Sequence, residues 1–374
     1  MESSDGGKSK PQTVMLKILD RYILVKFLGT FFVAIALILM IAVVFDISEK
    51  IEDFVSKGAS LREIVMDHYM NFLVFYGNLF SSMIVFIATI FFTSKMTART
   101  ELVAMLTGGM SFKRLLYPYF LGATLIAGIS LYLSHFVIPK TNETRLNFEW
   151  RYIKDKSKER FQNLHRQIRP GHMIFLENYN TRRMSGYHFA YEHFEGQRML
   201  SAMKSDFMRY DTVTTKWRLD NVVIRSIDED GTQHLRRERR IDTTLALLPE
   251  DLATIIYNAE MMPTPELNEF IRAEQLRGSE NVNYFIIEKL KRTSWPASTY
   301  ILVLIALSLS SQKTRGGLGL NIAIGLAICV SYIFFMQIST TFATLSNFPP
   351  LLAVWLPNIF FSLLGLYLYA RAPK

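Results

Sequence analysis

The chain has 374 residues, of which 50% are hydrophobic and only 20% are charged, and its formal net charge is +9 at pH 7. The basic residues are spread along the chain and form no single recognition element, so this charge does not indicate a nucleic-acid partner. Three apolar stretches, about 150 mostly polar residues and three further apolar stretches predict a helical membrane protein with one inserted domain.

The N-terminal segment combines a polar tail with an amphipathic stretch. Residues 1–14 are polar and are expected to be disordered. From residue 15 to residue 27, apolar side chains recur at helical spacing and charged ones lie largely elsewhere. The apolar set is Leu16, Leu19, Ile23 and Phe27, and the charged set is Lys17, Asp20, Arg21 and Lys26. This pattern predicts a helix that lies in the membrane interface and runs into the first span.

Six apolar stretches are long enough to be transmembrane helices, since a bilayer core of roughly 30 Å needs about 20 residues of helix. They cover residues 28–45, 72–92, 115–138, 295–309, 318–335 and 351–370. The fourth has the shortest unbroken apolar run, but Trp295 and Tyr300 suit a membrane interface and Pro296 suits a first helical turn. The predicted layout is two groups of three spans, in residues 15–138 and 293–374.

The short connecting segments differ in charge between the two sides of the predicted bundle. Basic residues gather before the first span, after the second, after the fourth and at the end of the chain, at Lys8, Lys10, Lys17, Arg21, Lys26, Lys95, Arg99, Lys113, Arg114, Lys313, Arg315, Arg371 and Lys374. The opposite segments are the acidic residues 46–67 and the uncharged residues 343–350. By the positive-inside rule, both termini are expected in the cytoplasm and residues 139–292 on the outer side.

Within residues 139–292 the hydrophobic period changes from helical to alternating. Predicted strands, separated by turn signals, cover residues 172–177, 187–194, 199–210, 216–226 and 234–248. Short strands with almost no helix predict an all-β domain, either a sandwich, a jellyroll-like fold or an open barrel. The single cysteine, Cys329, lies in the fifth span, so no disulfide links this domain. A helix is predicted after residue 263, with an apolar face of Leu267, Phe270, Ile271 and Leu276.

The segment between the second and third spans is the best candidate for a specific contact with another protein. It predicts a short helix over about residues 100–106 that ends at Gly108 and Gly109. Arg99 and Glu101 are expected on its exposed side. Such a helix can lie across the membrane face and insert into a groove of a partner. A plain connecting turn stays open as the alternative, because the same residues suit an ordinary helix start.

No arrangement in the sequence predicts catalysis. The chain lacks the Gly-x-x-x-x-Gly-Lys-[Ser/Thr] motif that cradles nucleotide phosphates. His188 and His193 are expected on opposite faces of a strand, which is wrong for a shared metal ion. No paired carboxylates and no Ser/His/Asp set can be assigned. We therefore expect a chain that is not an enzyme and binds no metal or cofactor of its own.

Three motifs resemble those of the LptF/LptG (YjgP/YjgQ) permeases, the membrane halves of the bacterial lipopolysaccharide exporter. They are Leu-Asp-Arg-Tyr-Ile at 19–23, Arg-Thr-Glu-Leu-Val-Ala-Met at 99–105 with Gly108 and Gly109, and Phe-Pro-Pro at 348–350 with Trp-Leu-Pro-Asn at 355–358. The opening motif is more LptG-like than LptF-like. The likeness covers nearly the whole chain and implies six spans in the bacterial inner membrane with a periplasmic β-jellyroll domain.

The resemblance also implies an ATP-driven export machine with several partners. This chain and a sister LptF/LptG-like permease would pair above an LptB-like ATPase dimer, which uses ATP and Mg²⁺. Lipopolysaccharide from the outer leaflet of the inner membrane would pass to an LptC-like or LptA-like periplasmic jellyroll protein. The loop after the second span would then be the ATPase-coupling helix, and its coupling residues would be Arg99, Glu101, Met105, Gly108 and Gly109.

A lipid with several acyl chains and acidic sugars needs apolar walls and a basic rim. Candidate wall residues in the spans are Phe31, Phe32, Phe80, Phe86, Phe334 and Phe335. Aromatic residues in membrane helices also simply pack or face lipid, so this assignment stays open. In the outer domain, Phe189 and Tyr191 are the candidates for an apolar groove that shields acyl chains from water. Lys140, Arg145 and Arg151 are the candidates for headgroup contacts, or else ordinary surface charges.

The segment after the first span differs in charge from the same segment of the LptF/LptG permeases that the chain resembles. Where they carry basic residues, this chain has Asp46, Glu49 and Glu52, with Lys50 among them. This composition predicts either a lipid with fewer phosphates or a divalent cation that bridges carboxylates and phosphates.

Two other functions stay open from the sequence. A membrane-embedded enzyme acting on lipid or sugar predicts polar residues clustered within the spans, but Asn78, Gln337 and Asn358 are too few and unlinked. An ABC-type mechanotransmission protein would pass ATPase strokes to its outer domain without carrying lipid. Six spans favour a lipid cavity over this second alternative.

Overall fold

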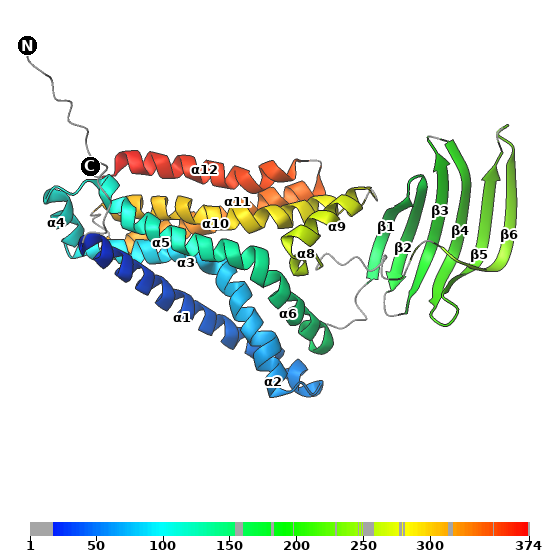
Figure 1. Ribbon diagram of the computed structural model, residues 1–374, viewed down its shortest axis with the longest axis horizontal. Helices are drawn as coiled ribbons and strands as arrows, with labels where there is room; N and C mark the ends of the chain where they lie inside the picture. Colours follow the sequence, from blue (N-terminus) through cyan, green and yellow to red (C-terminus); the bar gives the residue numbers. More distant parts are fainter. Residues whose placement is uncertain are drawn as a thin grey trace, which may run out of the picture.

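The structure is a computed structural model that describes residues 18–372 except 154–159, 181–182, 197, 229, 246, 248, 250–257, 277–278, 280, 313–316 and 347. Six helical stretches are long and apolar enough to cross a membrane, three before and three after an inserted β-sheet (Figure 1). The predicted six-helix bundle with an inserted all-β domain is therefore confirmed. The predicted tail, residues 1–14, and Leu16 lie outside the described residues.

The helices of the first group extend beyond the apolar runs. They are α1 (Ile18–Ser56), α2 (Leu61–Glu63) with the π-helical η1 (Ile64–Tyr69) and α3 (Met70–Ala98), then α4 (Glu101–Thr107), and α5 (Phe112–Tyr132) with the π-helical η2 (Leu133–Val137) and α6 (Ile138–Tyr152). The added turns at the end of α1, in α2 and η1, and in α6 carry polar side chains and lie toward the sheet, whereas the first turns of α1 and the last turns of α3 lie at the opposite end (Figure 1). Because backbone hydrogen bonds continue where the apolar face ends, hydropathy does not mark the ends of these helices.

The predicted N-terminal helix runs without a break into the first span, so that α1 is one helix of 39 residues. Ile23 and Phe27 are buried in the bundle, as expected of the apolar face, but Leu19 is 40% exposed and Asp20 is buried. Asp20 accepts a charge-assisted hydrogen bond from Arg114 in the first turn of α5. This ion pair turns one charged position of α1 inward, which corrects the expected amphipathic pattern.

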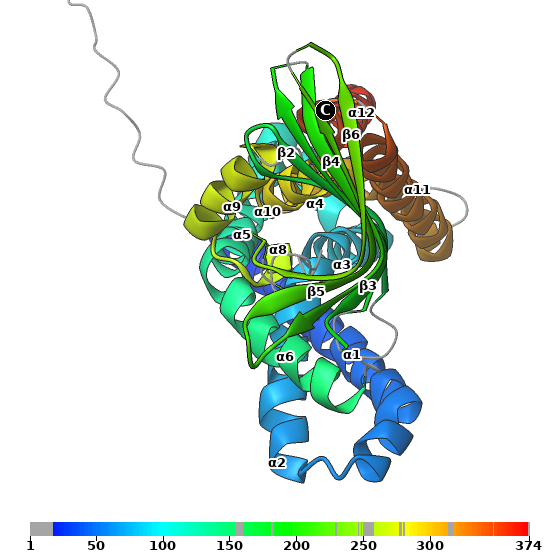
Figure 2. The ribbon, with the colours of Figure 1, turned by 90° about the vertical axis from the view of Figure 1, so that its right-hand side faces the viewer.

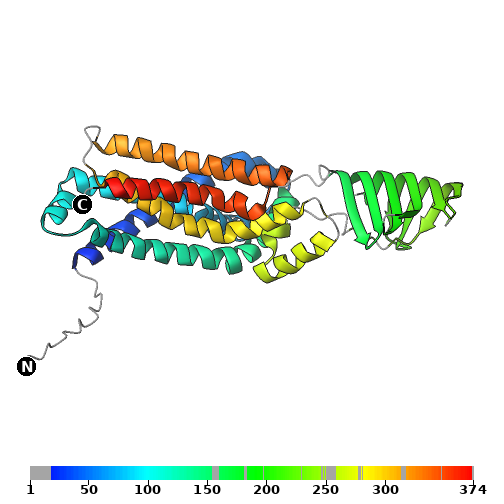
Figure 3. The same ribbon diagram turned by 90° about the horizontal axis from the view of Figure 1, so that it is seen from above.

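The second group comprises α8 (Asn258–Met261), α9 (Thr264–Leu276), α10 (Val282–Ser310), α11 (Gly317–Leu345) and α12 (Pro350–Arg371). On α9, Leu267 and Ile271 are buried, but Leu276 is 82% exposed and does not share their face. The reason is that nine residues after Leu267 correspond to about two and a half helical turns. Helices α10, α11 and α12 lie side by side along the bundle (Figure 1 and Figure 3).

The position of α10 explains why the fourth span has the weakest apolar signal. Of the 18 consecutive residues that form the most apolar part of α10, 61% are buried within the protein. The corresponding share for α1 is 11%. Its polar side chains form hydrogen bonds across helices: Thr299 Oγ1 lies 2.9 Å from Ser82 Oγ, and Asn358 Nδ2 donates to Ser294 Oγ at 2.8 Å. A helix that contacts protein and not lipid can keep such groups, because their partners are supplied internally.

The inserted domain is an antiparallel sheet whose six described strands pair in chain order. They are β1 (Arg160–Arg169), β2 (His172–Asn180), β3 (Ser185–Glu195), β4 (Arg198–Asp211), β5 (Lys216–Ile227) and β6 (Gln233–Thr243). The sheet is strongly curved (Figure 2) and buries an apolar cluster formed by Ile174, Leu176, Tyr179, Phe189, Met208, Trp217, Leu219, Val222 and Leu247. Trp217 Nε1 donates to the carbonyl oxygen of Leu247 at 2.7 Å, which ties the segment after β6 to this core.

Two strand assignments from the sequence need correction. β1 was not predicted, because its residues are mostly polar and show no apolar alternation. It is an edge strand that pairs only with β2 among the described strands. The strand predicted over residues 234–248 ends at Thr243.

The side-chain alternation of β3 is interrupted at His188, whose φ is +54°. Phe189 is buried and Tyr191 is half-buried against the core, but Tyr187 is 54% exposed. Tyr187 therefore does not share the face of Phe189 and Tyr191, although strict alternation along the strand would place all three together. The left-handed residue shifts the side-chain pattern by one position while the pairing register with β2 and β4 stays unchanged, and Asn221 in β5 adopts the same conformation.

The sheet brings together two histidines that the sequence did not pair. The rings of His172 and His193 stack with centroids 4.0 Å apart, and the Tyr191 hydroxyl lies 2.8 Å from Nδ1 of His172. Partial burial, followed by the charges of His193 and Arg169, lowers the pKa of His172. His188 instead pairs with Glu177.

Acidification is expected to loosen strands β2 and β3. Because the pKa of His172 is lower in the folded sheet than in the unfolded chain, its protonation favours unfolding. Stability is therefore retained above the ordinary histidine pKa of about 6.5 and lost as the pH falls below it. Relative to the intrinsic amide exchange rate at each pH, the protection of these strands from hydrogen exchange should be weaker at about pH 5.5 than at about pH 7.5, and His172→Gln should remove the difference. An unchanged pH dependence in this variant would assign the effect to another group.

Candidate functional site

The predicted contact loop forms helix α4, one residue further along the chain than expected. Thr100 does not cap it with its side chain: its φ is +61°, and its Oγ1 donates to the carbonyl oxygen of Arg99. The helix is held to the bundle by Leu102, which is fully buried, and ends at Gly108, followed by Gly109 with φ +91°. The left-handed conformation at Gly109 is adopted most readily by glycine, which explains the residue at this position.

A hollow of about 760 Å³ lies beside α4. It is lined by Leu19, Asp20, Glu101, Ala104, Met105, Gly108, Gly109, Met110, Ser111 and Arg114. Four of the five predicted coupling residues, all except Arg99, therefore line one cavity. The Asp20–Arg114 ion pair also lines it, and sequence reasoning missed this pair because 94 residues separate its members. An open hollow with apolar, acidic and basic walls suits a protein segment better than a small metabolite.

Glu101 connects α4 to α1. Its Oε2 accepts a hydrogen bond of 3.1 Å from the Tyr22 hydroxyl. Arg99 is exposed and lines a neighbouring groove with Glu101. The start of α4 is therefore in direct contact with α1, whose apolar segment has the smallest buried share among the six candidate spans.

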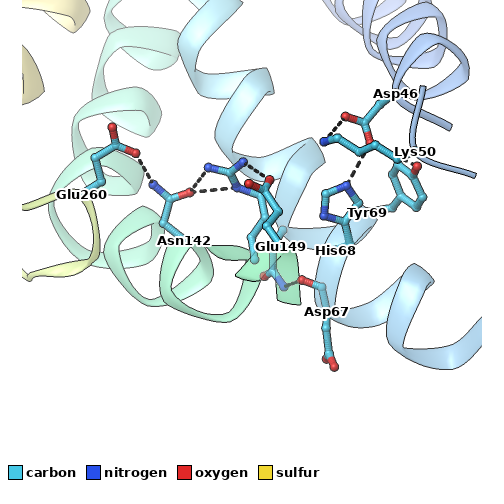
Figure 4. Close-up of polar contacts among 10 residues, drawn as sticks. Asp46, Lys50, Asp67, His68, Tyr69, Asn142, Glu149 and Glu260 are labelled. Atoms are coloured by element: carbon cyan, nitrogen blue, oxygen red, sulfur yellow. Dashed lines mark hydrogen bonds and ion pairs between the residues drawn. The ribbon is translucent and has the colours of Figure 1, made fainter. Parts of the chain in front are cut away.

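At the opposite end of the bundle, the three predicted headgroup residues do not form one rim. Lys140 is exposed, and Arg151 is exposed with an ion pair of 3.4 Å to Glu63. Arg145 is only 5% exposed. Its guanidinium donates to Glu149 at 2.8 Å and to Asn142 Oδ1 at 3.1 and 2.9 Å (Figure 4). The expected position of Arg145 at the outer surface is therefore wrong.

Aromatic rings explain the burial of this cation. The Arg145 guanidinium lies 4.7 Å from the centre of the Phe75 ring and 5.8 Å from that of Tyr76. Both rings come from α3, against which α6 packs. Cation–π contact and the Glu149 carboxylate together compensate the lost hydration of the guanidinium.

The sequence suggested that Asp46 is a carboxylate exposed at the outer surface. Its carboxylate instead contacts other side chains of the same chain (Figure 4). Its carboxylate lies 2.5 Å from Lys50 Nζ and 2.9 Å from His68 Nε2, and it accepts a 3.2 Å hydrogen bond from Tyr69. Glu49 and Glu52 remain exposed. The Asp46 side chain therefore ties α1 to η1, and any bridging of a divalent cation to phosphate is left to other carboxylates.

A small cavity of about 260 Å³, lined by both polar and apolar side chains, lies between α3, η2, α6, α8, α10 and α11 at the same end. Its lining includes Asn142, Glu260, Glu288, Lys291 and Arg292. Asn142 Nδ2 donates to Glu260 at 3.3 Å (Figure 4). The sequence did not indicate this cavity, because Asn142 and Glu260, which meet in it, are 118 residues apart in the chain. Both signs of charge meet here, which suits a polar group of headgroup size.

The aromatic residues predicted to line an acyl cavity have different surroundings. Phe31 and Phe86 are buried in the bundle, Phe80 and Phe335 are half-buried, and Phe32 and Phe334 are exposed. Buried rings are part of the helix packing in a single chain, whereas exposed rings face whatever surrounds the bundle. The structure therefore does not gather the six into one cavity wall.

Comparison with known proteins gives one result that covers most of the chain. The family model described as "Lipopolysaccharide export system permease LptF/LptG" matches residues 21–371. No curated protein matches the chain. The matched range includes α4, both groups of spans and the inserted sheet.

Proposed function

Because the chain belongs to the LptF/LptG family of lipopolysaccharide export system permeases, we propose that it extracts lipopolysaccharide, or a related glycolipid, from the inner membrane for delivery toward the outer membrane. The observation that carries this proposal is the family match across both groups of spans and the sheet. The chain is a multi-pass membrane subunit of such a system. Its opening motif supports an LptG-like role within the family.

We propose that α4 faces the cytoplasm and the sheet faces the periplasm. Helix α4, the first turn of α5 and the end of α12 all lie at the end of the molecule away from the sheet (Figure 1). These segments carry Arg99, Lys113, Arg114 and Arg371. Positive charge in short loops is retained on the cytoplasmic side of a membrane.

The energy for extraction is proposed to come from an LptB-like ATPase dimer that docks in the hollow beside α4. The chain itself has no phosphate-cradling motif, so ATP and Mg²⁺ are assigned to that partner. The supporting geometry is the connection from α4 through Glu101 and Tyr22 to α1. Movement of α4 would in this way tilt or shift α1.

A sister LptF/LptG-like permease is proposed to complete the lipid cavity. The middle of α1 exposes a row of apolar side chains, among them Val33, Leu37, Met40, Ile41 and Val44. In a pair of permeases, this helix would form part of a wall shared by the two chains. The sheet would then receive the acyl chains, and an LptC-like or LptA-like jellyroll protein would continue the path.

The route through the sheet is tested by photo-crosslinking at two tyrosines of β3. A crosslinker at the half-buried Tyr191 is expected to capture lipopolysaccharide during ATP turnover in the reconstituted complex. Tyr187, four residues away, is the matched control, because the left-handed residue His188 places it outside the core. Phe189 is unsuitable, since its replacement would disturb the core. Equal capture at Tyr187 and Tyr191 would contradict a path along the core face.

A further inference from the structure

A groove between α1 and α3 ends next to α4, and the function proposed above does not use this end. Its volume is about 810 Å³, within the range of roughly 300–1,000 Å³ typical of ligand sites. Its walls are mainly apolar and include Val25, Val33 and Leu37 on α1 with Ile87, Phe91 and Phe92 on α3. A long apolar groove at the surface of a membrane helix pair has the shape and chemistry of an acyl-chain site.

The end of this groove next to α4 is basic. Lys26, Lys95 and Arg99 line it, against a single lining carboxylate, Glu101, which accepts the hydrogen bond from Tyr22. Three cations against one carboxylate leave an excess of two positive charges. Within the described part of the chain, no ion pair of 4.0 Å or less involves any of these three cations.

We propose that this groove binds one anionic glycerophospholipid. An acyl chain would lie between α1 and α3, and the phosphate would lie between Lys26, Lys95 and Arg99. We choose an anionic lipid because its charge complements that of the groove. Clustered Lys and Arg side chains attract anionic lipids, and a guanidinium binds phosphate through paired hydrogen bonds. A neutral lipid or an uncharged helix would leave the excess of two positive charges uncompensated.

The inferred lipid would bind at a different place from the exported cargo. The basic end of the groove lies at the α4 end of the bundle, whereas the cargo is proposed to leave at the end that carries the sheet. With the orientation proposed above, the bound lipid belongs to the cytoplasmic leaflet. Its headgroup would contact Arg99, the residue between α3 and α4, and so hold the start of α4 in place.

Native mass spectrometry of the purified full chain tests the charge requirement. Phosphatidylglycerol is expected to bind more tightly than phosphatidylcholine with the same acyl chains. The triple variant Lys26→Gln, Lys95→Gln, Arg99→Gln should lose affinity for phosphatidylglycerol by on the order of 100-fold, at roughly fivefold for each cation. The matched control Arg21→Gln, Lys113→Gln, Arg371→Gln removes the same charge from exposed positions at the same end and should retain wild-type binding.

A second pair of variants tests the acyl site without changing charge. Gly29 lines the groove, and no atom lies within 4 Å of a Cβ added there, so Gly29→Leu should fold normally while filling the groove. Gly128 on α5 has the same free space and does not line the groove, which makes Gly128→Leu the control. Phosphatidylglycerol binding should fall at least about tenfold in Gly29→Leu alone.

Four results would overturn the proposal. Equal binding of the two phospholipids would remove the charge requirement, and equal losses in the two triple variants would place the lipid elsewhere. Unchanged binding in Gly29→Leu, with an unchanged melting temperature, would exclude the groove as the acyl site. Displacement of phosphatidylglycerol by lipopolysaccharide would assign the groove to the cargo. None of these outcomes depends on whether the assembled complex exports lipid.

Discussion

Replacement of Glu101 by Lys is expected to abolish export and to release the ATPase from the permease. Glu101 begins α4 and lines the proposed docking hollow with Met105, Gly108 and Gly109. The change converts a partly buried charge contact into a repulsion, at a cost of roughly 2–5 kcal/mol. Because about 1.4 kcal/mol corresponds to tenfold in affinity, assembly should weaken by at least about 30-fold. Co-purification of the ATPase with the tagged permease pair measures this loss.

A second variant distinguishes two contacts of Glu101, the one within its own chain and the proposed one with the ATPase. Tyr22→Phe removes the hydroxyl that donates to Glu101 but leaves the carboxylate in place. A neutral hydrogen bond contributes about 1 kcal/mol, so this variant should retain most of the ATPase. Wild-type assembly and export by Glu101→Lys would remove the coupling role from α4. An equal defect in both variants would show that Glu101 acts through α1.

Replacement of Arg145 by Met is expected to destabilise the chain by about 3–5 kcal/mol. The substitution leaves Glu149, itself 7% exposed, without the guanidinium that lies 2.8 Å from it. Removing one partner of a buried ion pair costs this much because the remaining charge stays desolvated. It also removes the cation from the rings of Phe75 and Tyr76. Thermal unfolding of the detergent-solubilised chain measures the effect.

The double variant Arg145→Met, Glu149→Leu is the control for this interpretation. Replacing both members of a buried pair by apolar groups of similar size is often close to neutral, so most of the lost stability should return. Lys140→Gln and Arg151→Gln change exposed cations and should alter stability by no more than about 0.5 kcal/mol. If these two contact a lipid headgroup, they should instead lower lipid loading, most strongly at low salt. Loss of loading with full stability in Arg145→Met would restore the headgroup role expected from the sequence.

Features that depend on local composition were predicted well from the sequence. The six spans follow from apolar runs, because transfer of a helix into lipid depends on the residues of that helix alone. The inserted all-β domain follows from a change of hydrophobic period, and α4 follows from the Gly108–Gly109 pair after a short helical pattern. Family membership was likewise accessible, because its motifs are contiguous in the chain.

Features that depend on which elements pack together were decided only by the tertiary structure. Asp20 is buried because Arg114, 94 residues away, reaches it from α5. Arg145 is buried because α3 brings two aromatic rings over it, although its sequence position beyond an apolar run indicates a surface charge. Periodicity assigns a side chain to a face of its own helix or strand, but the neighbouring element determines whether that face meets protein, lipid or water.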